Sequence, residues 1–348
     1  GGLQTSSPVS AQVMGHVDGR RAWSAALPGA QTFAGTVFYP FAGADVLSVI
    51  PLFPNARSIV LAALHKVGAC QPSTWPDLPA RVKMVSSMMQ GIFIKWGGYF
   101  GTEEMFEHFD DTGYGVTPFL LASLSFLGEE PLSIECGPNV GPQGASLGLP
   151  AGNAVRIVHR NKGTGAVREL VYACLDLLTP SLALNSFLLT MRQQGPLTTM
   201  LKATAYIVRQ YQDNMINRRP GTLLNADPIV KVIVEASQAI LQDDTGVRAS
   251  CLAGWSLTFW GNYVGPAFIQ NVTMNISSDY DDSLHSQWCH SAQHRPLPVR
   301  FGYPMFYLMP GCPNQYNHAC AGFSVGGPPG PIQTTNGFAI YAVKSSAP

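Results

Sequence analysis

The fold is decided by residues 36–67, which read TVFYPFAGADVLSVIPLFPNARSIVLAALHKV. Two apolar runs, Thr36–Tyr39 and Ser58–Leu64, enclose a turn and a short helical stretch at Val46–Leu52. Strands that are apolar at almost every position are typical of parallel sheets, which are buried on both faces. The stretch therefore predicts a strand–helix–strand unit, and its first loop lies where such sheets bind ligands.

The rest of the chain predicts a mixed order of helices and strands. Residues 1–35 are rich in Gly, Ser and Ala, and we expect an extended N-terminal arm there. Apolar periodicity predicts helices at Thr117–Leu127, Ser181–Gln193, Leu197–Gln212 and Asp227–Leu241. Alternating or continuous apolar runs predict strands at Leu132–Cys136, Ala154–His159, Val167–Leu175, Trp255–Tyr263 and Phe338–Val343.

This order indicates one α/β, or mixed α+β, domain over residues 36–348. We expect a partly parallel central sheet that is flanked by helices, and a loop-rich C-terminal part. Within that part, residues 277–336 form an insertion that contains Cys and His residues.

The composition favours a protein that does not bind nucleic acid. Hydrophobic residues make up 46% of the 348 residues and charged residues 12%, about half the share in an average soluble domain. Lys plus Arg and Asp plus Glu are equal at 21 each, whereas nucleic acids and anionic membranes need a basic surface. The longest apolar runs are too short for a bilayer, so we expect no membrane span. Because the chain begins with Gly1-Gly2, we expect that a preceding segment was removed.

Cysteines and glycosylation sequons indicate an oxidising compartment, for a secreted, extracellular or periplasmic protein. None of the seven cysteines has the C-x-x-C spacing of a zinc or redox site. Asn271 and Asn275 begin consecutive N-x-S/T sequons and are the expected glycosylation sites. Cys312 and Cys320 bracket a short loop and are the best disulfide candidates. Cys174 lies in an apolar run, where we expect a buried thiol.

Asp45 is the first candidate for ligand binding. It ends the turn Gly43-Ala44-Asp45 after the first strand, where it could hold a hydroxyl or phosphate group. A dinucleotide site would need more glycines and an acid at the end of the second strand, which ends instead at His65-Lys66. A turn in which Asp45 caps the next helix is the favoured interpretation.

Asp243 and Asp244 form a second carboxylate candidate, in the sequence QDDTG at 242–246. Adjacent carboxylates could bind a cation or act as acid and base. A tight turn with Gly246 at positive φ explains the same residues and is favoured. If Asp45, Asp243 and Asp244 converge in one cleft, they would line the pocket of an enzyme.

His285, Cys289, His290 and His294 are the densest group of potential metal ligands. On a helix, the first two would share one face, and so would the last two. Imidazole and thiolate suit zinc or copper. The favoured alternative is a polar surface loop whose Cys289 forms a disulfide, so that no cofactor is bound.

Residues 144–148, GASLG, match the G-x-S-x-G pattern of a hydrolase nucleophile elbow. That elbow needs a strand directly before the serine and a helix directly after it. Pro142 and Pro150 flank the pattern, so the context does not predict a hydrolase.

Three sets of residues together resemble a family of uncharacterised bacterial proteins that are expected to be exported. The sets are Tyr39–Asp45 with Phe53–Ala56, Leu197–Tyr206 with Ile240–Gly246, and Pro298–Tyr303 with Ala339–Val343. The resemblance implies no reaction. It implies only that Asp45 and Asp243-Asp244 recur in motifs (YPFxGxD and ILQDDxG). The chain departs from the family in its Cys/His-rich segment, and its sequons resemble those of a eukaryotic, secreted form.

The favoured function is that of a non-enzymatic extracytoplasmic protein, a binding or structural component of a cell surface or extracellular matrix. Its expected partners are other proteins or glycans of an extracellular assembly. One alternative is an enzyme of unknown reaction with a pocket at Asp45, Asp243 and Asp244. Another is a secreted protein that binds metal through residues 285–294.

Overall fold

The chain forms two compact units, Gly1–Met200 with Lys231–Gln238 and Leu201–Val230 with Ala239–Pro348. A single domain over residues 36–348 stays a prediction. The computed structural model describes residues 8–70, 85, 115–137, 140–177, 179–202, 228–243, 246–247, 249–261, 287, 291, 294–295, 297–299, 301 and 338–345.

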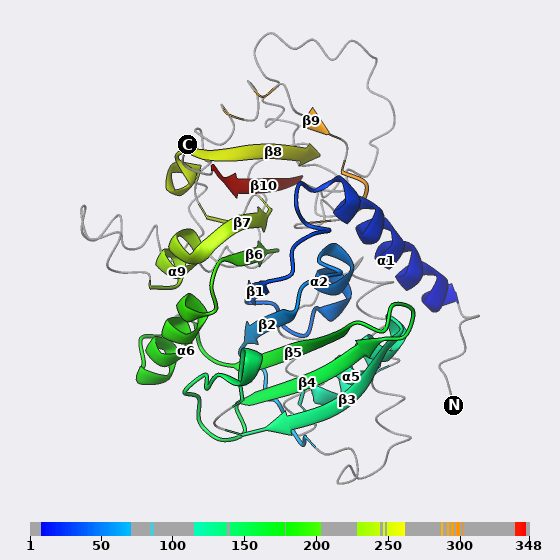
Figure 1. The fold of residues 1–348 in the computed structure, drawn as a ribbon, viewed down its shortest axis with the longest axis vertical. Helices are drawn as coiled ribbons and strands as arrows, with labels where there is room; N and C mark the ends of the chain where they lie inside the picture. Colours follow the sequence, from blue (N-terminus) through cyan, green and yellow to red (C-terminus); the bar gives the residue numbers. More distant parts are fainter. Residues whose placement is uncertain are drawn as a thin grey trace, which may run out of the picture. The chain divides into compact units, whose positions relative to one another are not determined.

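The first unit contains a mixed sheet with the strand order β3-β4-β5-β2-β1-β6 (Figure 1). β1 pairs in parallel with β2 on one side and with β6 on the other, and β2 also pairs in parallel with β5. β4 pairs antiparallel with both β3 and β5. The predicted α/β fold with a partly parallel sheet is therefore confirmed. The strands are β1 Thr36–Pro40, β2 Ser58–Ala63, β3 Glu129–Cys136, β4 Ala154–Asn161, β5 Val167–Cys174 and β6 Leu197–Leu201.

The strand–helix–strand unit forms as the sequence predicts. Every residue of β1 and β2 is buried, and Phe38 lies opposite Val60 in their parallel register. Helix α2, Val46–Leu52, connects the two strands and is also buried at every position. Burying apolar surface contributes about 25 cal/mol per Å². These three elements therefore supply much of the hydrophobic stabilisation of the first unit.

The N-terminal segment contains a helix where the sequence analysis expected an extended arm. Helix α1 spans Pro8–Ala26 and packs against α2. Ser24 Oγ donates a hydrogen bond to the carbonyl oxygen of Leu52, at the end of α2. The buried residues of α1 follow helical spacing. They are Val13, Val17, Arg20, Trp23 and Ser24. An arginine in this stripe and two glycines in the helix obscure the pattern in the sequence.

Helices α5 and α6 lie where they are predicted, at Thr117–Phe126 and Leu182–Gln193. Ser181 caps α6, because its Oγ accepts from the backbone N–H of Leu184 at 3.0 Å. Thr117 does not cap α5. Its Oγ1 donates instead to the carbonyl oxygen of Val67 at 2.7 Å, so the hydroxyl joins the helix to the segment after β2.

A helix predicted at Leu197–Gln212 is wrong at its beginning. Leu197–Leu201 forms β6, which is buried at every position and parallel to β1. A short apolar run fits a fully buried strand as well as a helix, and the β-branched Thr198 and Thr199 favour the strand.

The helix predicted at Asp227–Leu241 is shorter than expected. Helix α9 spans Pro228–Ala236, and Ser237–Gln242 continues as strand β7. The continuous apolar run Ala239–Leu241 suits a buried strand, which explains the change of structure within one predicted element.

In the second unit, the described strands follow the order β7-β10-β8-β9. β10 is antiparallel to both β7 and β8, and β9 pairs in parallel with β8. The two predicted strands of this region, now β8 and β10, are confirmed. The bounds are β8 Trp255–Gly261, β9 His294–Arg295 and β10 Phe338–Lys344, and a short 3₁₀ turn spans Ala249–Leu252.

Two glycines that flank α5 allow a matched test of how closely the beginning of this helix packs against the segment after β2. Gly115 and Gly128 both have positive φ, at 66° and 78°. A Cβ at Gly115 would collide with the backbone of Val67 and Gly68, whereas a Cβ at Gly128 would meet no atom within 4 Å.

We expect Gly128→Ala to lower the free energy of unfolding by about 1 kcal/mol, because it adds only left-handed backbone strain. Gly115→Ala should cost about 3 kcal/mol or more, since overpacking against backbone adds to the strain. Urea denaturation of both variants measures the difference, and equal losses would contradict the close approach at Gly115.

Candidate functional site

The loop after β1 holds the first predicted site residue, Asp45. Its carboxylate is buried, with an exposed fraction of 3%. Tyr39 Oη donates to Oδ2 at 3.1 Å, and the backbone N–H of Ser48 donates to Oδ1 at 3.2 Å. Asp45 therefore caps α2 and closes the loop, which is the interpretation that the sequence favoured.

The same loop carries a backbone outlier. Phe41 has a φ of 59°, which a bulky residue rarely adopts, and Gly43 has a φ of 54°. The backbone N–H of Ala42 donates to the carbonyl oxygen of Ala62 at 3.2 Å, which fixes the loop on β2. Because β1 lies between β2 and β6, this is the point at which the strand order reverses. Open α/β sheets bind ligands at that point.

Polar residues at the ends of the neighbouring strands were not proposed for this site from the sequence. Cys174 ends β5, and its Sγ donates to the carbonyl oxygen of Leu64 at 3.3 Å. Cys174 is half-buried rather than fully buried as expected. His65 follows β2, and its carbonyl oxygen accepts from Tyr172 Oη at 2.9 Å. The signal that could have identified these residues is their position directly after predicted parallel strands.

The end of β7, in the second unit, holds Asp243. It is fully buried, and its backbone N–H donates to the carbonyl oxygen of Leu201 at 3.1 Å. The Gln242 side chain makes two hydrogen bonds of 2.9 Å to the backbone of Val247. Gly246 N–H donates to the Asp243 carbonyl oxygen at 3.2 Å. This last hydrogen bond closes a turn, as the sequence favoured, and the positive φ expected at Gly246 stays a prediction.

The three residues of the expected carboxylate pocket do not all lie within one described unit. Asp45 belongs to the first unit and Asp243 to the second, and Asp244 lies outside the described residues. A shared pocket of these three carboxylates stays a prediction. A general base must come within hydrogen-bond reach of its substrate. The Asp45 carboxylate is instead engaged with Tyr39 and Ser48.

Most of the predicted metal-binding, glycosylation and C-terminal disulfide residues lie outside the described residues. His294 is the exception. Its backbone is described and pairs with Phe259 as part of β9, but its side chain is not described. Within the described ranges, no three His, Cys, Asp or Glu side chains are grouped as a metal site. The residues outside the description are His285, Cys289, His290, Asn271, Asn275, Cys312 and Cys320.

The G-x-S-x-G residues form a loop rather than a nucleophile elbow. A 3₁₀ turn at Pro142–Gly144 comes before Ser146, and no strand or helix adjoins that serine. Thr190 Oγ1, from α6, donates to the Ser146 carbonyl oxygen at 2.9 Å. The backbone N–H of Gln143 donates to Glu169 Oε1 at 2.6 Å, which fixes the loop on β5.

Cys70 and Cys136 form a disulfide that the sequence analysis did not predict. The two Cα atoms are 6.1 Å apart, and 66 positions separate the residues in the chain. The bond connects the segment after β2 to the end of β3. Long sequence separation hides such a pair, because proximity arises only when the strands have assembled.

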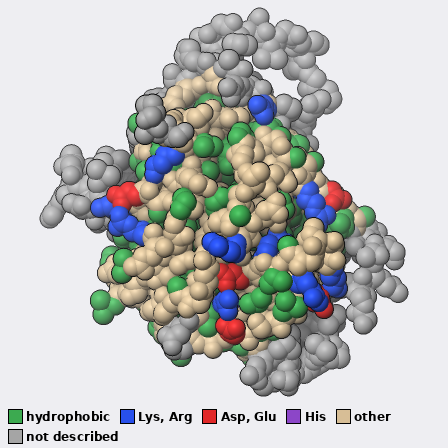
Figure 2. Space-filling model, in the orientation of Figure 1, with side chains coloured by type: hydrophobic (Ala, Val, Ile, Leu, Met, Phe, Trp, Pro, Cys, Tyr) green, Lys and Arg blue, Asp and Glu red, His purple; other side chains and the backbone are tan. Residues whose placement is uncertain are grey.

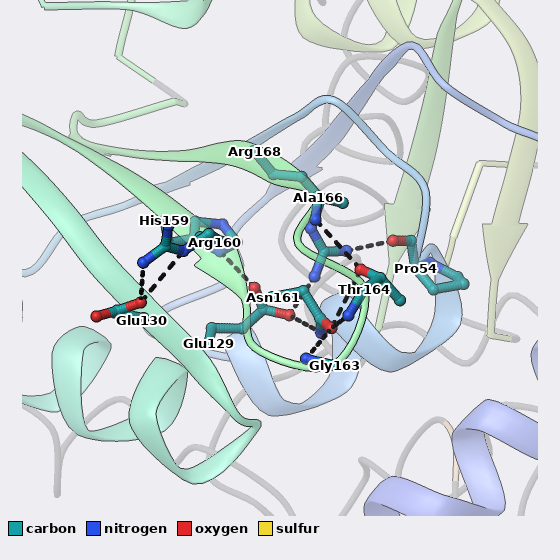
Figure 3. A network of polar contacts seen from close by, with 10 residues as sticks. All are labelled: Pro54, Glu129, Glu130, His159, Arg160, Asn161, Gly163, Thr164, Ala166 and Arg168. Atoms are coloured by element: carbon teal, nitrogen blue, oxygen red, sulfur yellow. Dashed lines mark hydrogen bonds and ion pairs between the residues drawn. The ribbon is translucent and has the colours of Figure 1, made fainter.

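A buried polar network connects charged groups of several strands in the described part of the chain (Figure 3). At its centre is Glu129, the first residue of β3, with an exposed fraction of 1%. His159 Nδ1 lies 2.8 Å from Oε2, and Asn161 Nδ2 donates to Oε1 at 2.8 Å. Arg168, from β5, donates both to Oε1 and to the carbonyl oxygen of Pro54.

This network joins three antiparallel strands to the loop between α2 and β2. Burial raises the pKa of Glu129, but hydrogen bonds from His159 and Asn161 and the charge of Arg168 outweigh burial and lower it below the ordinary 4.5. Since Glu129, His159 and Arg168 are all buried, no substrate can reach them in this arrangement. The network therefore fixes the beginning of β3 to β4, β5 and the loop before β2.

The surface carries few charges, and these are mixed in sign. On the face drawn in Figure 2, basic and acidic side chains lie among wide uncharged areas. Arg160 with Glu130 and Arg192 with Glu235 are exposed ion pairs. No helix in the described ranges combines the length and apolar character that crossing a bilayer requires.

Comparisons with family models, with curated proteins and with solved structures find no match to this chain. The fold and the loop after β1 define the class of the protein. It is an α/β protein with a capped, buried loop at the point where the strand order of its sheet reverses.

Variants of Asp45 test its capping role. Asp45→Ala removes the acceptor for both donors, and we expect a loss of about 2 kcal/mol in the free energy of unfolding. Asp45→Asn keeps an oxygen for the Ser48 N–H and should cost less than about 1 kcal/mol. Chemical denaturation measures both losses.

The matched control is Asp18→Ala, which removes an exposed ion pair with Arg21 within α1. Exposed pairs contribute about 0.5 kcal/mol or less. A loss for Asp45→Ala no larger than that for the control would contradict the capping role.

Proposed function

We propose that this chain is a non-enzymatic extracytoplasmic protein that binds to, or forms part of, a cell surface or extracellular matrix. The observation that carries the proposal is the Cys70–Cys136 disulfide. Disulfides persist in secretory and extracellular compartments and are rare in reducing ones. The proposed partners are other proteins or glycans of an extracellular assembly.

The location of the disulfide supports a structural role. It closes a long loop, and by chain entropy such a bond stabilises the folded state by roughly 4 kcal/mol. It also ties down the end of β3, an edge strand of the sheet in the first unit. A protein outside the cell gains from covalent restraint, since no chaperone system maintains it there.

The roles of the buried carboxylates support the non-enzymatic part of the proposal. Asp45 caps a helix, and Glu129 joins three strands to a loop. Asp243 lies buried in a tight turn. Catalytic carboxylates have to meet a substrate, whereas each of these is engaged within the protein.

The competing function is that of an enzyme with its site in the loop after β1. The observation that favours it is the positive φ of Phe41 at the reversal point of the sheet. Strained backbone collects at functional sites, and this is the position at which open α/β sheets bind ligands. Rearrangement of the Tyr39–Asp45 contact would be needed to expose the carboxylate.

Intact mass and peptide mapping test the proposed compartment. We expect protein from its natural source to yield one cross-linked peptide containing Cys70 and Cys136 before reduction, and to lose mass on treatment with glycosidase. Seven cysteines that are all alkylated without reduction, together with an unchanged mass after glycosidase, would refute the extracytoplasmic assignment.

The disulfide also has an expected energetic effect. Cys70→Ser combined with Cys136→Ser should lower the free energy of unfolding by roughly 4 kcal/mol. The matched control is Cys174→Ser, which removes a thiol at the end of β5 and leaves the cross-link intact. Guanidinium denaturation of both proteins is the measurement, and equal losses would contradict the role given to the cross-link.

A further inference from the structure

The Glu129 carboxylate fits its surroundings only when it is ionised. Asn161 and Arg168 donate to Oε1, and His159 Nδ1, which donates in the tautomer that carries a proton there, lies 2.8 Å from Oε2. An ionised carboxylate is purely an acceptor, but a protonated one carries an O–H group that itself needs an acceptor. Protonation would therefore place one donor among other donors in a buried site.

Protonation would also leave a buried charge without its partner. Arg168 has an exposed fraction of 6%, and Glu129 is the acid with which it forms an ion pair. Its remaining contact is the carbonyl oxygen of Pro54, which is neutral. The titratable and charged groups that face Glu129 in the described residues are His159 from β4 and Arg168 from β5.

The geometry of β3 confines the effect of protonating Glu129 to one end of the strand. In the described part of the chain, β3 lies at the edge of the sheet and pairs with β4. The register shifts between Pro131 and Ser133, so a short stretch that includes Glu129 is separate from the rest of the ladder. The other end of β3 is tied by the disulfide of Cys136.

We propose that Glu129 is an acid-operated latch, whose protonation releases the first residues of β3 from β4 and β5 while the Cys136 end stays tethered. The latch is a conformational device of the edge of the sheet, with its hinge at the register shift after Pro131. It does not depend on the proposed extracytoplasmic function.

The direction of the pH dependence follows from linkage. The pKa of Glu129 in the folded state lies below the ordinary 4.5, because its hydrogen bonds and the charge of Arg168 outweigh burial. Its stabilising contribution is therefore fully present above pH 4.5 and is lost as the pH falls through the folded-state pKa. The latch is closed at neutral pH and opens in acid.

The first test compares Glu129→Gln with the matched control Glu130→Gln, which removes the exposed partner of Arg160 on the same strand. The measurement is the folding equilibrium constant from urea denaturation between pH 7 and pH 3. Below pH 4.5, the constant of the wild-type protein should fall more steeply than that of Glu129→Gln, by up to about tenfold per pH unit. Glu130→Gln should change the slope far less, because the ion pair with Arg160 that lowers the pKa of Glu130 is exposed and screened by solvent. Equal slopes for the wild type and Glu129→Gln would overturn the proposal.

A second measurement uses the wild-type protein alone, in case Glu129→Gln does not fold. Amide exchange, corrected for intrinsic rates, is recorded at pH 7 and at pH 3.5. Residues 129–130 and 160–161 should lose more protection in acid than residues 134–136 and 155–157, by up to about tenfold. Equal losses along β3, or no loss at either end, would overturn the latch.

Discussion

The first unit depends on the complete burial of β1 and β2. All of their residues are inaccessible to solvent, so their backbone groups must be paired on both sides and their side chains covered on both faces. The backbone groups are paired because β5 and β6 add parallel strands on either side of β1 and β2. The buried helix α2 helps to cover the side chains. The position of each neighbouring element follows from this requirement.

Charged residues are few, and several of them are buried in the described part of the chain. Only 12% of the residues are charged. Even so, Glu129, Arg168 and Asp45 are buried, and each is engaged in contacts that fix a strand end, a loop or a helix. Buried charges are weak sources of net stability but specify geometry, because an unpaired one is costly. This use of charge explains why Asp45, a candidate ligand-binding residue in the sequence, acts as a helix cap.

Much of the fold could be predicted from local patterns. Continuous apolar runs identified β1 and β2, and the residues of α2 followed from the turn before it and Pro54 after it. The mistaken segments are those in which one pattern fits two structures. Leu197–Leu201 has a spacing that suits a helix, but its place beside β1 makes it a strand. Helix α1 was missed because Arg20 interrupts its apolar stripe.

The candidate site was less predictable than the fold. Asp45 could be identified as a cap, because a carboxylate before a short helix has a local function. The Glu129 network and the Cys70–Cys136 disulfide could not, since their members come from distant parts of the chain. Pairing at such separation depends on the strand order, which one sequence does not reveal.

The most direct test of this account is the neighbourhood of β1. Nuclear Overhauser measurements on deuterated protein report which backbone amides lie side by side. The account predicts contacts from the amides around Phe38 both to those around Val60 and to those around Thr199, in a parallel pattern. An antiparallel pattern, or a β1 with contacts to only one of these strands, would contradict it.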